Sequence, residues 1–240
     1  MTNPMTVSDA RVPIQRGLLA LVTMATMPLV STPLRSQDRG VLILKRGSET
    51  IGREEFVVRR GRGSGALAGF TVVSTAWYPA ERPERSLESV VEVGPDSSPT
   101  AVRLEAGNGD PKRVLIALGR DRVTVRSLTS AGESAREYPA TQRHVLVDDS
   151  LFAPHVFPPK GIDGEARTLS LGGSRGAPAR IVDHGTVTTT VGTSTLTLRH
   201  VSILSPQIER HLWYDERGRL IKVEDPRLGL TVIRSGDIGG

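Results

Sequence analysis

The chain has 240 residues, with 31 lysines and arginines against 26 acidic residues and no cysteine. The absence of cysteine excludes disulfides, thiolate metal sites and a lipid-modified N-terminal cysteine. The 25 glycines and 16 prolines interrupt the chain too often for long helices, and the basic residues are scattered without the interleaved aromatic residues that stack on nucleic-acid bases. We therefore expect many short strands and no nucleic-acid partner.

Residues 1–36 have the pattern of an export signal. Arg11 and Arg16 precede the apolar run GLLALVTMATMPLV, residues 17–30, and a small and polar segment follows. This run contains a proline and is short for a bilayer span, which needs about 20 residues. The sequence predicts that the signal is removed, leaving residues 37–240 as one periplasmic or secreted β domain with no membrane span. Retention of the apolar run as an anchor is the alternative.

From Arg39 onward, apolar side chains recur with a period of two, which is typical of strands that bury one face. Residues 41–60 predict two strands joined by a glycine turn, and Glu54 and Glu55 are expected on opposite faces of the second. The next strand, LAGFTVVSTAWYP, ends at Pro79, which cannot donate to a sheet ladder. Further strands are expected at residues 86–94, 100–107, 112–119, 121–129, 134–140 and 143–149.

The strand pattern stops at residues 148–160, DDSLFAPHVFPPK, where two aspartates precede three prolines. Aspartates suit the start of a helix, whereas prolines end regular structure, so we expect a short helical turn or an apolar loop. Strand patterns resume at ARTLSLG, PARIVDHG and the threonine-rich residues 186–203. Turn signals spaced by about 8 to 12 residues are typical of a sandwich or barrel.

The last part of the chain predicts a three-stranded meander. Gly218 supplies the positive φ of the first turn, and PRLG makes the second. Strict alternation predicts one core face and one semi-polar face. The residues that share a face are Leu212 with Tyr214, His211 with Trp213, Ile221 with Val223, Leu220 with Lys222 and Glu224, and Leu230 with Val232.

Several motifs resemble those of known bacterial proteins. WYDERGRLIKVEDP resembles one copy of the YD-type hairpin of bacterial surface repeat proteins. The export signal, the G-x-x-x-x-G of Gly47–Gly52, VDDSLFAP and YDERGRL together resemble uncharacterised secreted bacterial β-proteins related in fold to lipoprotein-carrier half-barrels. That resemblance implies a large curved antiparallel sheet, or half-open barrel, around an apolar cavity, with residues 148–159 as its short helical or loop lid.

A serine motif supports an alternative interpretation as a secreted hydrolase. GGSRG, residues 172–176, has the G-x-S-x-G spacing of a nucleophile elbow around Ser174. Pro178 and a strand pattern follow where that elbow requires a helix, so a hairpin loop is the competing interpretation. GRGSGA, residues 61–66, imitates a dinucleotide-binding fingerprint but leads into a strand.

The hydrolase alternative includes a metal site at His144, Asp148 and His155, with Asp149 nearby. Imidazole and carboxylate groups are ligands that suit zinc. The competing interpretation is structural, because acids at the end of a strand commonly cap backbone amides and histidines near prolines are ordinary loop residues. We therefore expect no metal ion and no cofactor.

Aromatic side chains give the leading hypothesis. Two Trp-Tyr pairs each put one ring on either face of a strand, so at least one ring of each pair is expected to face a cavity or a partner, with two phenylalanines as cover. We expect a non-enzymatic protein that binds a lipid-like ligand or an envelope protein on the concave face of its sheet; a purely structural interaction module of the cell envelope is a further alternative. The expected ligand-binding residues are Trp77, Tyr78, Phe152, Phe157, Trp213 and Tyr214.

Overall fold

The computed structural model describes residues 37–61, 69–81, 83–107, 112–140, 143–159, 164–171 and 175–236. The expected export signal and its apolar run lie outside the described residues, as does Ser174. Most of the glycine-rich loop GRGSGA lies outside them too. The export signal, the single mature domain and the serine nucleophile therefore stay predictions.

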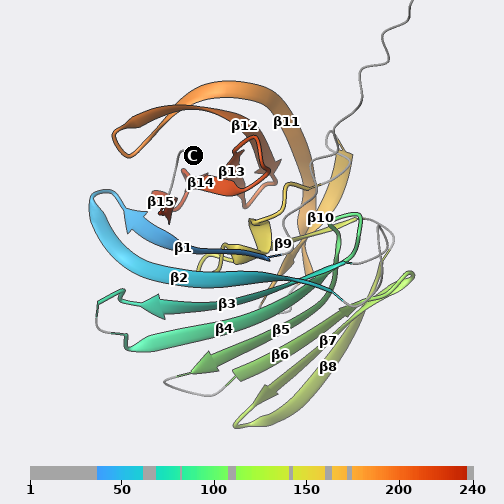
Figure 1. Ribbon diagram of the computed structural model, residues 1–240. Coiled ribbons are helices and arrows are strands. Elements are labelled where there is room, and N and C mark those ends of the chain that lie inside the picture. The colour runs from blue at the N-terminus through green and yellow to red at the C-terminus, as the bar shows by residue number, and fades with distance from the viewer. Residues whose placement is uncertain are drawn as a thin grey trace, which may run out of the picture. The chain divides into compact units, whose positions relative to one another are not determined.

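Fifteen strands form a single sheet (Figure 1). The described chain contains one helix, the three-residue 3-10 helix η2 (Ala153–His155), and none that could span a bilayer. The predicted all-β class and the predicted short helical turn are confirmed. The strands are β1 (Gln37–Arg46), β2 (Glu49–Arg60), β3 (Phe70–Tyr78), β4 (Arg85–Val93), β5 (Pro99–Gly107), β6 (Lys112–Leu118), β7 (Arg122–Thr129), β8 (Gly132–Pro139), β9 (His144–Val147), β10 (Gly164–Ser170), β11 (Arg175–Val191), β12 (Ser194–Leu204), β13 (Glu209–Tyr214), β14 (Leu220–Asp225) and β15 (Leu230–Ser235).

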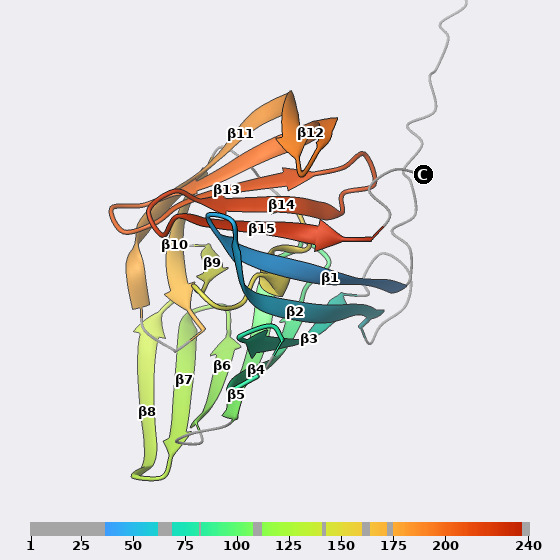
Figure 2. The ribbon, with the colours of Figure 1, turned by 90° about the vertical axis from the view of Figure 1, so that its left-hand side faces the viewer.

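The sheet consists of two meanders joined by the pairing of β1 with β15 (Figures 1 and 2). Its order runs from β8 through β1, then from β15 through β9, so β8 and β9 form its two edges. All pairs are antiparallel except β9 with β10, which is parallel. The sheet curves until β9 lies against β5, without the edges pairing. The result is the expected half-open barrel.

Alternation along the strands separates an inner face from an outer face. In β2, Glu54, Phe56 and Val58 are buried on the inner face, whereas Arg53 and Glu55 are exposed on the outer face. The prediction that Glu54 and Glu55 point to opposite faces is confirmed. Inward apolar side chains from both meanders form one large core.

A second, smaller core lies on the outer side of the last strands. β11 is one strand of 17 residues that joins PARIVDHG to the threonine-rich segment, and the turn at Gly192 (φ +60°) separates it from β12. The tip of this hairpin packs Val191 and Leu198 against Trp213 and Ile221. The long hairpin is therefore anchored by apolar contacts on a face that alternation marked as semi-polar.

The closing meander follows the prediction except at one bulge. Gly218 has a φ of +72°, and Tyr214 belongs to the main core while Trp213 does not. A register shift next to Trp213 lets Leu220 face the main core and turns Ile221 toward the second core. The predicted faces of Leu220 and Ile221 were wrong, because a β-bulge inserts one residue and reverses the alternation.

Replacing Gly52 tests how tightly the inner face is packed. A Cβ atom at Gly52 would overlap the ring of Tyr78. Gly52→Ala should therefore lower the free energy of unfolding by about 1–3 kcal/mol, the usual cost of overpacking. Ser134→Ala, at an exposed position of edge strand β8, should change it by less than about 0.5 kcal/mol in the same urea titration. Equal effects of the two substitutions would contradict the packing seen at Gly52.

Candidate functional site

Residues 148–159 fill the inside of the curved sheet, and we call this segment the plug. Its apolar side chains Leu151, Phe152, Ala153 and Val156 are at most 3% exposed and belong to the main core. Figure 1 shows η2 within the curve of the sheet. The segment expected to be a lid over a cavity is thus a part of the core.

The start of η2 is fixed by a buried carboxylate. The backbone N–H of Phe152 donates to Glu54 Oε2 at 2.7 Å, and that of Ala153 donates to the same oxygen at 3.1 Å. Glu54 is fully buried, and this burial raises the pKa of its carboxyl to about 7, although the hydrogen bonds from the plug favour the ionised form. One inward side chain of β2 therefore holds the plug through its backbone.

A buried arginine holds the other side of the plug. Arg210 is fully buried and donates from Nη1 to His155 Nε2 at 3.3 Å and from Nη2 to Asp225 at 3.2 Å and Asp149 at 3.5 Å. Its guanidinium carbon lies 4.9 Å from the centre of the Phe152 ring. Burial and the nearby guanidinium lower the pKa of His155 to about 3, so this ring is neutral and can accept the hydrogen bond.

Two tyrosines and one aspartate complete the anchoring of the plug. Tyr214 donates its hydroxyl hydrogen to the His155 carbonyl at 2.9 Å, and Tyr78 donates to the Ser150 carbonyl. Burial raises the pKa of both phenols, so both keep the proton that they donate. Asp148 Oδ1 accepts from the Ser150 N–H at 2.8 Å, which is the capping role expected of an acid at a strand end.

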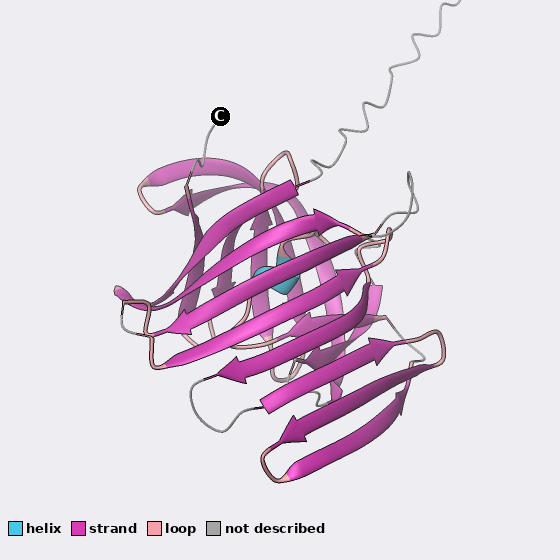
Figure 3. Ribbon diagram, turned by 60° about the horizontal axis from the view of Figure 1, so that its bottom comes forward, coloured by secondary structure: helices cyan, strands magenta, loops and turns pink. Residues whose placement is uncertain are grey.

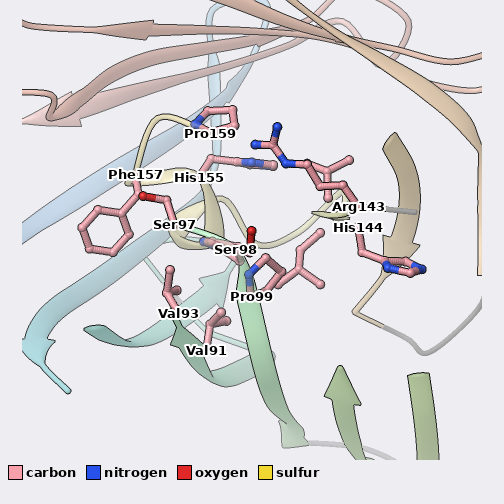
Figure 4. A pocket seen from close by; sticks show the side chains of 13 residues that line it. Val91, Val93, Ser97, Ser98, Pro99, Arg143, His144, His155, Phe157 and Pro159 are labelled. Atoms are coloured by element: carbon pink, nitrogen blue, oxygen red, sulfur yellow. The ribbon is translucent and has the colours of Figure 1, made fainter. Parts of the chain in front are cut away.

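The free space left beside the plug is small. A cavity of about 40 Å³ is bordered by plug residues His155 and Phe157, by His144 of β9, and by Val93 and Ser97 near the β4–β5 turn (Figure 4). One water molecule needs roughly 10–15 Å³, and pockets for small molecules usually measure about 300–1,000 Å³. This cavity therefore has room for a few waters and not for a lipid.

The six predicted ligand-binding residues divide between the two faces. Four of them contact or belong to the plug on the inner side: Tyr78, Phe152, Phe157 and Tyr214. Trp77 is half-buried on the outer face of β3, and Trp213 lies in the second core. Each Trp-Tyr pair puts one ring on either face, with the tyrosine as the inward member, because its two residues occupy consecutive positions of a strand. Ligand binding by the six residues stays a prediction.

The residues of the metal alternative do not converge. No group of three or more histidine and acidic side chains in the described ranges could hold one metal ion. Figure 4 shows the His144 ring directed away from the His155 ring. His155 Nε2 is occupied by Arg210, and Asp148 caps the backbone of Ser150. These side chains therefore have structural partners.

The outer face of the first meander carries half-buried apolar side chains among its polar ones. A solvated face of an antiparallel sheet normally carries polar side chains. Here the strand register aligns a row of four apolar and three arginine side chains, which we call the outer row. It consists of Arg39, Val57, Val73, Val90, Arg103, Leu115 and Arg126 on β1 to β7.

Two shallow hollows lie along the outer row. One, of about 350 Å³, is bordered by Val57, Val73 and Trp77, and the other, of about 360 Å³, by Val90 and Leu115. Figure 3 looks onto this face, with η2 behind the strands. No described helix or strand crosses it. Both hollows are thus on the outer side of the sheet.

Another row on the same face, four residues away along β2 and β3, connects the two tryptophans. Arg53 lies over the Trp77 ring at 5.0 Å, and Lys222 lies over the Trp213 ring at 4.9 Å. Sequence reasoning missed this alignment, because it depends on the pairing of β1 with β15, whose positions are almost 200 residues apart. The register places the following residues in one row: Trp77, Arg53, Ile43, Ile233, Lys222, Trp213 and His200.

Comparisons with known proteins give a structural likeness and no match in sequence. No family model matches the chain, and no curated protein matches it. Among solved structures, it is similar to the crystal structure of a β-barrel-like protein of the domain of unknown function DUF1849 from Brucella abortus, with 8% identity and a TM-score of 0.48 over 83% of this chain and 94% of that chain. The resemblance to lipoprotein carriers and YD-type proteins stays a prediction, and the fold class rests on the sheet itself.

Glu54 makes the stability depend on pH in a direction that can be tested. Its pKa rises from 4.5 in the unfolded chain to about 7 in the fold, so the folded state holds the proton more tightly. The stabilisation is complete below pH 4.5 and is lost as the pH rises through 7, a change of about 3 kcal/mol. Relative to Glu54→Gln, the wild-type protein should lose about this much stability over that range in urea titrations.

The exposed neighbour provides the control for this measurement. Glu55→Gln should leave the pH dependence of the free energy of unfolding parallel to that of the wild type. His155 changes the stability in the opposite direction with pH, since its pKa is lowered to about 3. Its contribution is the same in the wild type and in Glu54→Gln, so it cancels when the two are compared. A constant difference between wild type and Glu54→Gln from pH 4.5 to 7 would contradict the burial of this carboxyl.

Truncation of the plug's phenylalanines tests its place in the core. Phe152 is fully buried, so Phe152→Ala should lower the free energy of unfolding by about 3–5 kcal/mol through lost transfer energy and a new cavity. Phe157 is half-buried, so Phe157→Ala should cost only about 1–2 kcal/mol. Urea titration of both variants measures the difference. A loss below about 1 kcal/mol for Phe152→Ala would show that the plug is not packed as described.

Proposed function

We propose that this is a non-enzymatic binding protein of the cell envelope that docks a protein partner on the outer face of β1 to β7. The observation that carries the proposal is the outer row, which puts half-buried valines and a leucine on a face where polar side chains are expected. The envelope location rests on the export pattern of residues 1–36.

Energetics favour the outer face over the concave face. Burial of Leu151, Phe152 and Val156 contributes roughly 1.5–3 kcal/mol per side chain, so expelling the plug costs roughly 5–9 kcal/mol. An energy of 1.4 kcal/mol changes an equilibrium constant by a factor of ten. The plug would therefore be expelled in roughly one molecule in 10³ to 10⁶. A lipid-like ligand on the concave side would have to offset this cost. A partner on the outer face needs no such rearrangement.

The dimensions and composition of the outer face suit a protein. Seven strands at ~4.8 Å spacing and ~3.3 Å per residue give a face of roughly 29 by 23 Å, on the order of 650 Å². A stable protein interface buries about 800 Å² on each partner. Its apolar centre is edged by Arg39 and Arg126 and includes Trp77, and arginine and tryptophan are enriched at interfaces. A broad, shallow surface of this kind fits another folded surface better than a small molecule.

Site-specific photo-crosslinking tests the docking surface. A photo-reactive side chain placed at Val73, in the middle of the outer row, should give one covalent protein adduct in the cells that export this protein. The same group at Thr188, exposed on β11, should not. A charge in the row, Val90→Glu, should reduce the adduct at position 73 at least tenfold, because burying an unpaired carboxylate opposes docking. The half-buried outward position of Val90 should let the variant fold.

Three outcomes would overturn the proposal. The first is equal labelling from positions 73 and 188, and the second is labelling at 73 that Val90→Glu does not change. The third is a lipid retained by the purified protein in native mass spectrometry and released by a change in the plug, which would return the function to the concave side. An adduct of twice the chain mass would support the docking surface and identify a second copy as the partner.

A further inference from the structure

Three histidines form a ladder on the outer face of neighbouring strands. His184 lies on β11, His200 on β12 and His211 on β13, and they are three of the five histidines in the chain. The His200 ring stacks on His184 with centroids 4.3 Å apart and on Trp213 at 4.7 Å. Because His200 lies between two rings, stacking holds the plane of its imidazole ring.

Two imidazole nitrogens of this ladder converge. His200 Nε2 and His211 Nδ1 are 3.0 Å apart. The other nitrogen of His211, Nε2, lies 3.3 Å from Glu209 Oε1. An ionised carboxylate only accepts, so Glu209 fixes the proton of neutral His211 on Nε2 and leaves a lone pair on Nδ1, directed toward His200. This is the carboxylate–histidine arrangement that commonly orients a metal-binding imidazole.

The spacing of the two nitrogens fits a shared ion. Zinc–nitrogen bonds of about 2.0–2.1 Å at tetrahedral angles separate two ligand nitrogens by ~3.3–3.4 Å. The observed 3.0 Å separation needs only a few tenths of an ångström of side-chain rotation to reach this value. Both rings are partly accessible to solvent, so an ion and its water ligands can enter.

We propose that His200 Nε2 and His211 Nδ1 bind a divalent transition-metal ion, with Glu209 as the positioning residue and water completing the coordination. Zinc and copper are the class that imidazole nitrogen favours, whereas magnesium and calcium prefer oxygen. No third histidine or acidic ligand converges on this point in the described ranges, so the site has two protein ligands. It is distinct from His144, Asp148 and His155.

The ring hydrogens of His200 and His211 can rearrange for metal binding without a further protein group. In the metal-free state, His200 donates its Nε2 hydrogen to His211 Nδ1. On binding, the neutral His200 ring exchanges this hydrogen for the Nδ1 tautomer through solvent, so that Nε2 can bind the ion.

Zinc titration of the full chain without a histidine tag tests the site. Calorimetry at pH 7 should show one Zn²⁺ per chain, and Mg²⁺ should not compete. His211→Ala should weaken zinc binding at least 100-fold by removing a ligand. Glu209→Gln should weaken it about 10–100-fold by removing the orienting carboxylate. His144→Ala, which changes a histidine outside the ladder, should leave the affinity unchanged.

A spectroscopic measurement separates binding from a folding defect. Zinc should shift the imidazole nitrogen resonances of His200 and His211 in the wild-type protein while those of buried His155 stay in place. Circular dichroism should show that the metal-free variants fold like the wild type. Absence of zinc binding by the wild type, equal binding by wild type and His211→Ala, or shifts confined to other histidines would each overturn the proposal and leave a histidine–histidine hydrogen bond only.

Discussion

The hydrogen bonds from Phe152 and Ala153 to the buried carboxylate of Glu54 are the constraint on which the rest of the structure depends. A curved sheet whose edges do not pair leaves an interior that its own strands cannot fill. The plug fills that interior, and a plug with unpaired backbone N–H groups would be costly there. Glu54 satisfies two of them. Because the inner side is then closed, any binding role falls to the outer side.

The polar groups around the plug also specify one arrangement of it. Arg210 contacts His155, Asp149 and Asp225, so a shift of the plug by one residue would separate a buried charge from its partners. Removing one partner of a buried ion pair is costly because the other charge is left uncompensated. The Nε of Arg210 has no hydrogen-bond partner in the described chain. The network thus fixes the position of the plug at some expense in stability.

The two faces of the sheet separate two kinds of chemistry. Inside, ionisable groups are buried and paired with the backbone of the plug. Outside, the outer row offers apolar surface between arginines, and the histidine ladder offers ring nitrogens close to solvent. The protein docking surface and the metal site lie on different strands of this face, so each can be tested without disturbing the other. The long β11–β12 hairpin, folded onto Trp213, is anchored beside the histidines.

The sequence by itself determined the all-β class, most strand positions, the turn at Gly218 and the opposite faces of Glu54 and Glu55, since these depend on local alternation and turn chemistry. Tertiary structure decided the rest. The bulge beside Trp213 reversed the faces of Leu220 and Ile221, and the pairing of β1 with β15 aligned the two tryptophans. That residues 148–159 plug the interior depends on Glu54 and Arg210. These partners lie far away in the chain, and pairing between distant residues leaves no local pattern.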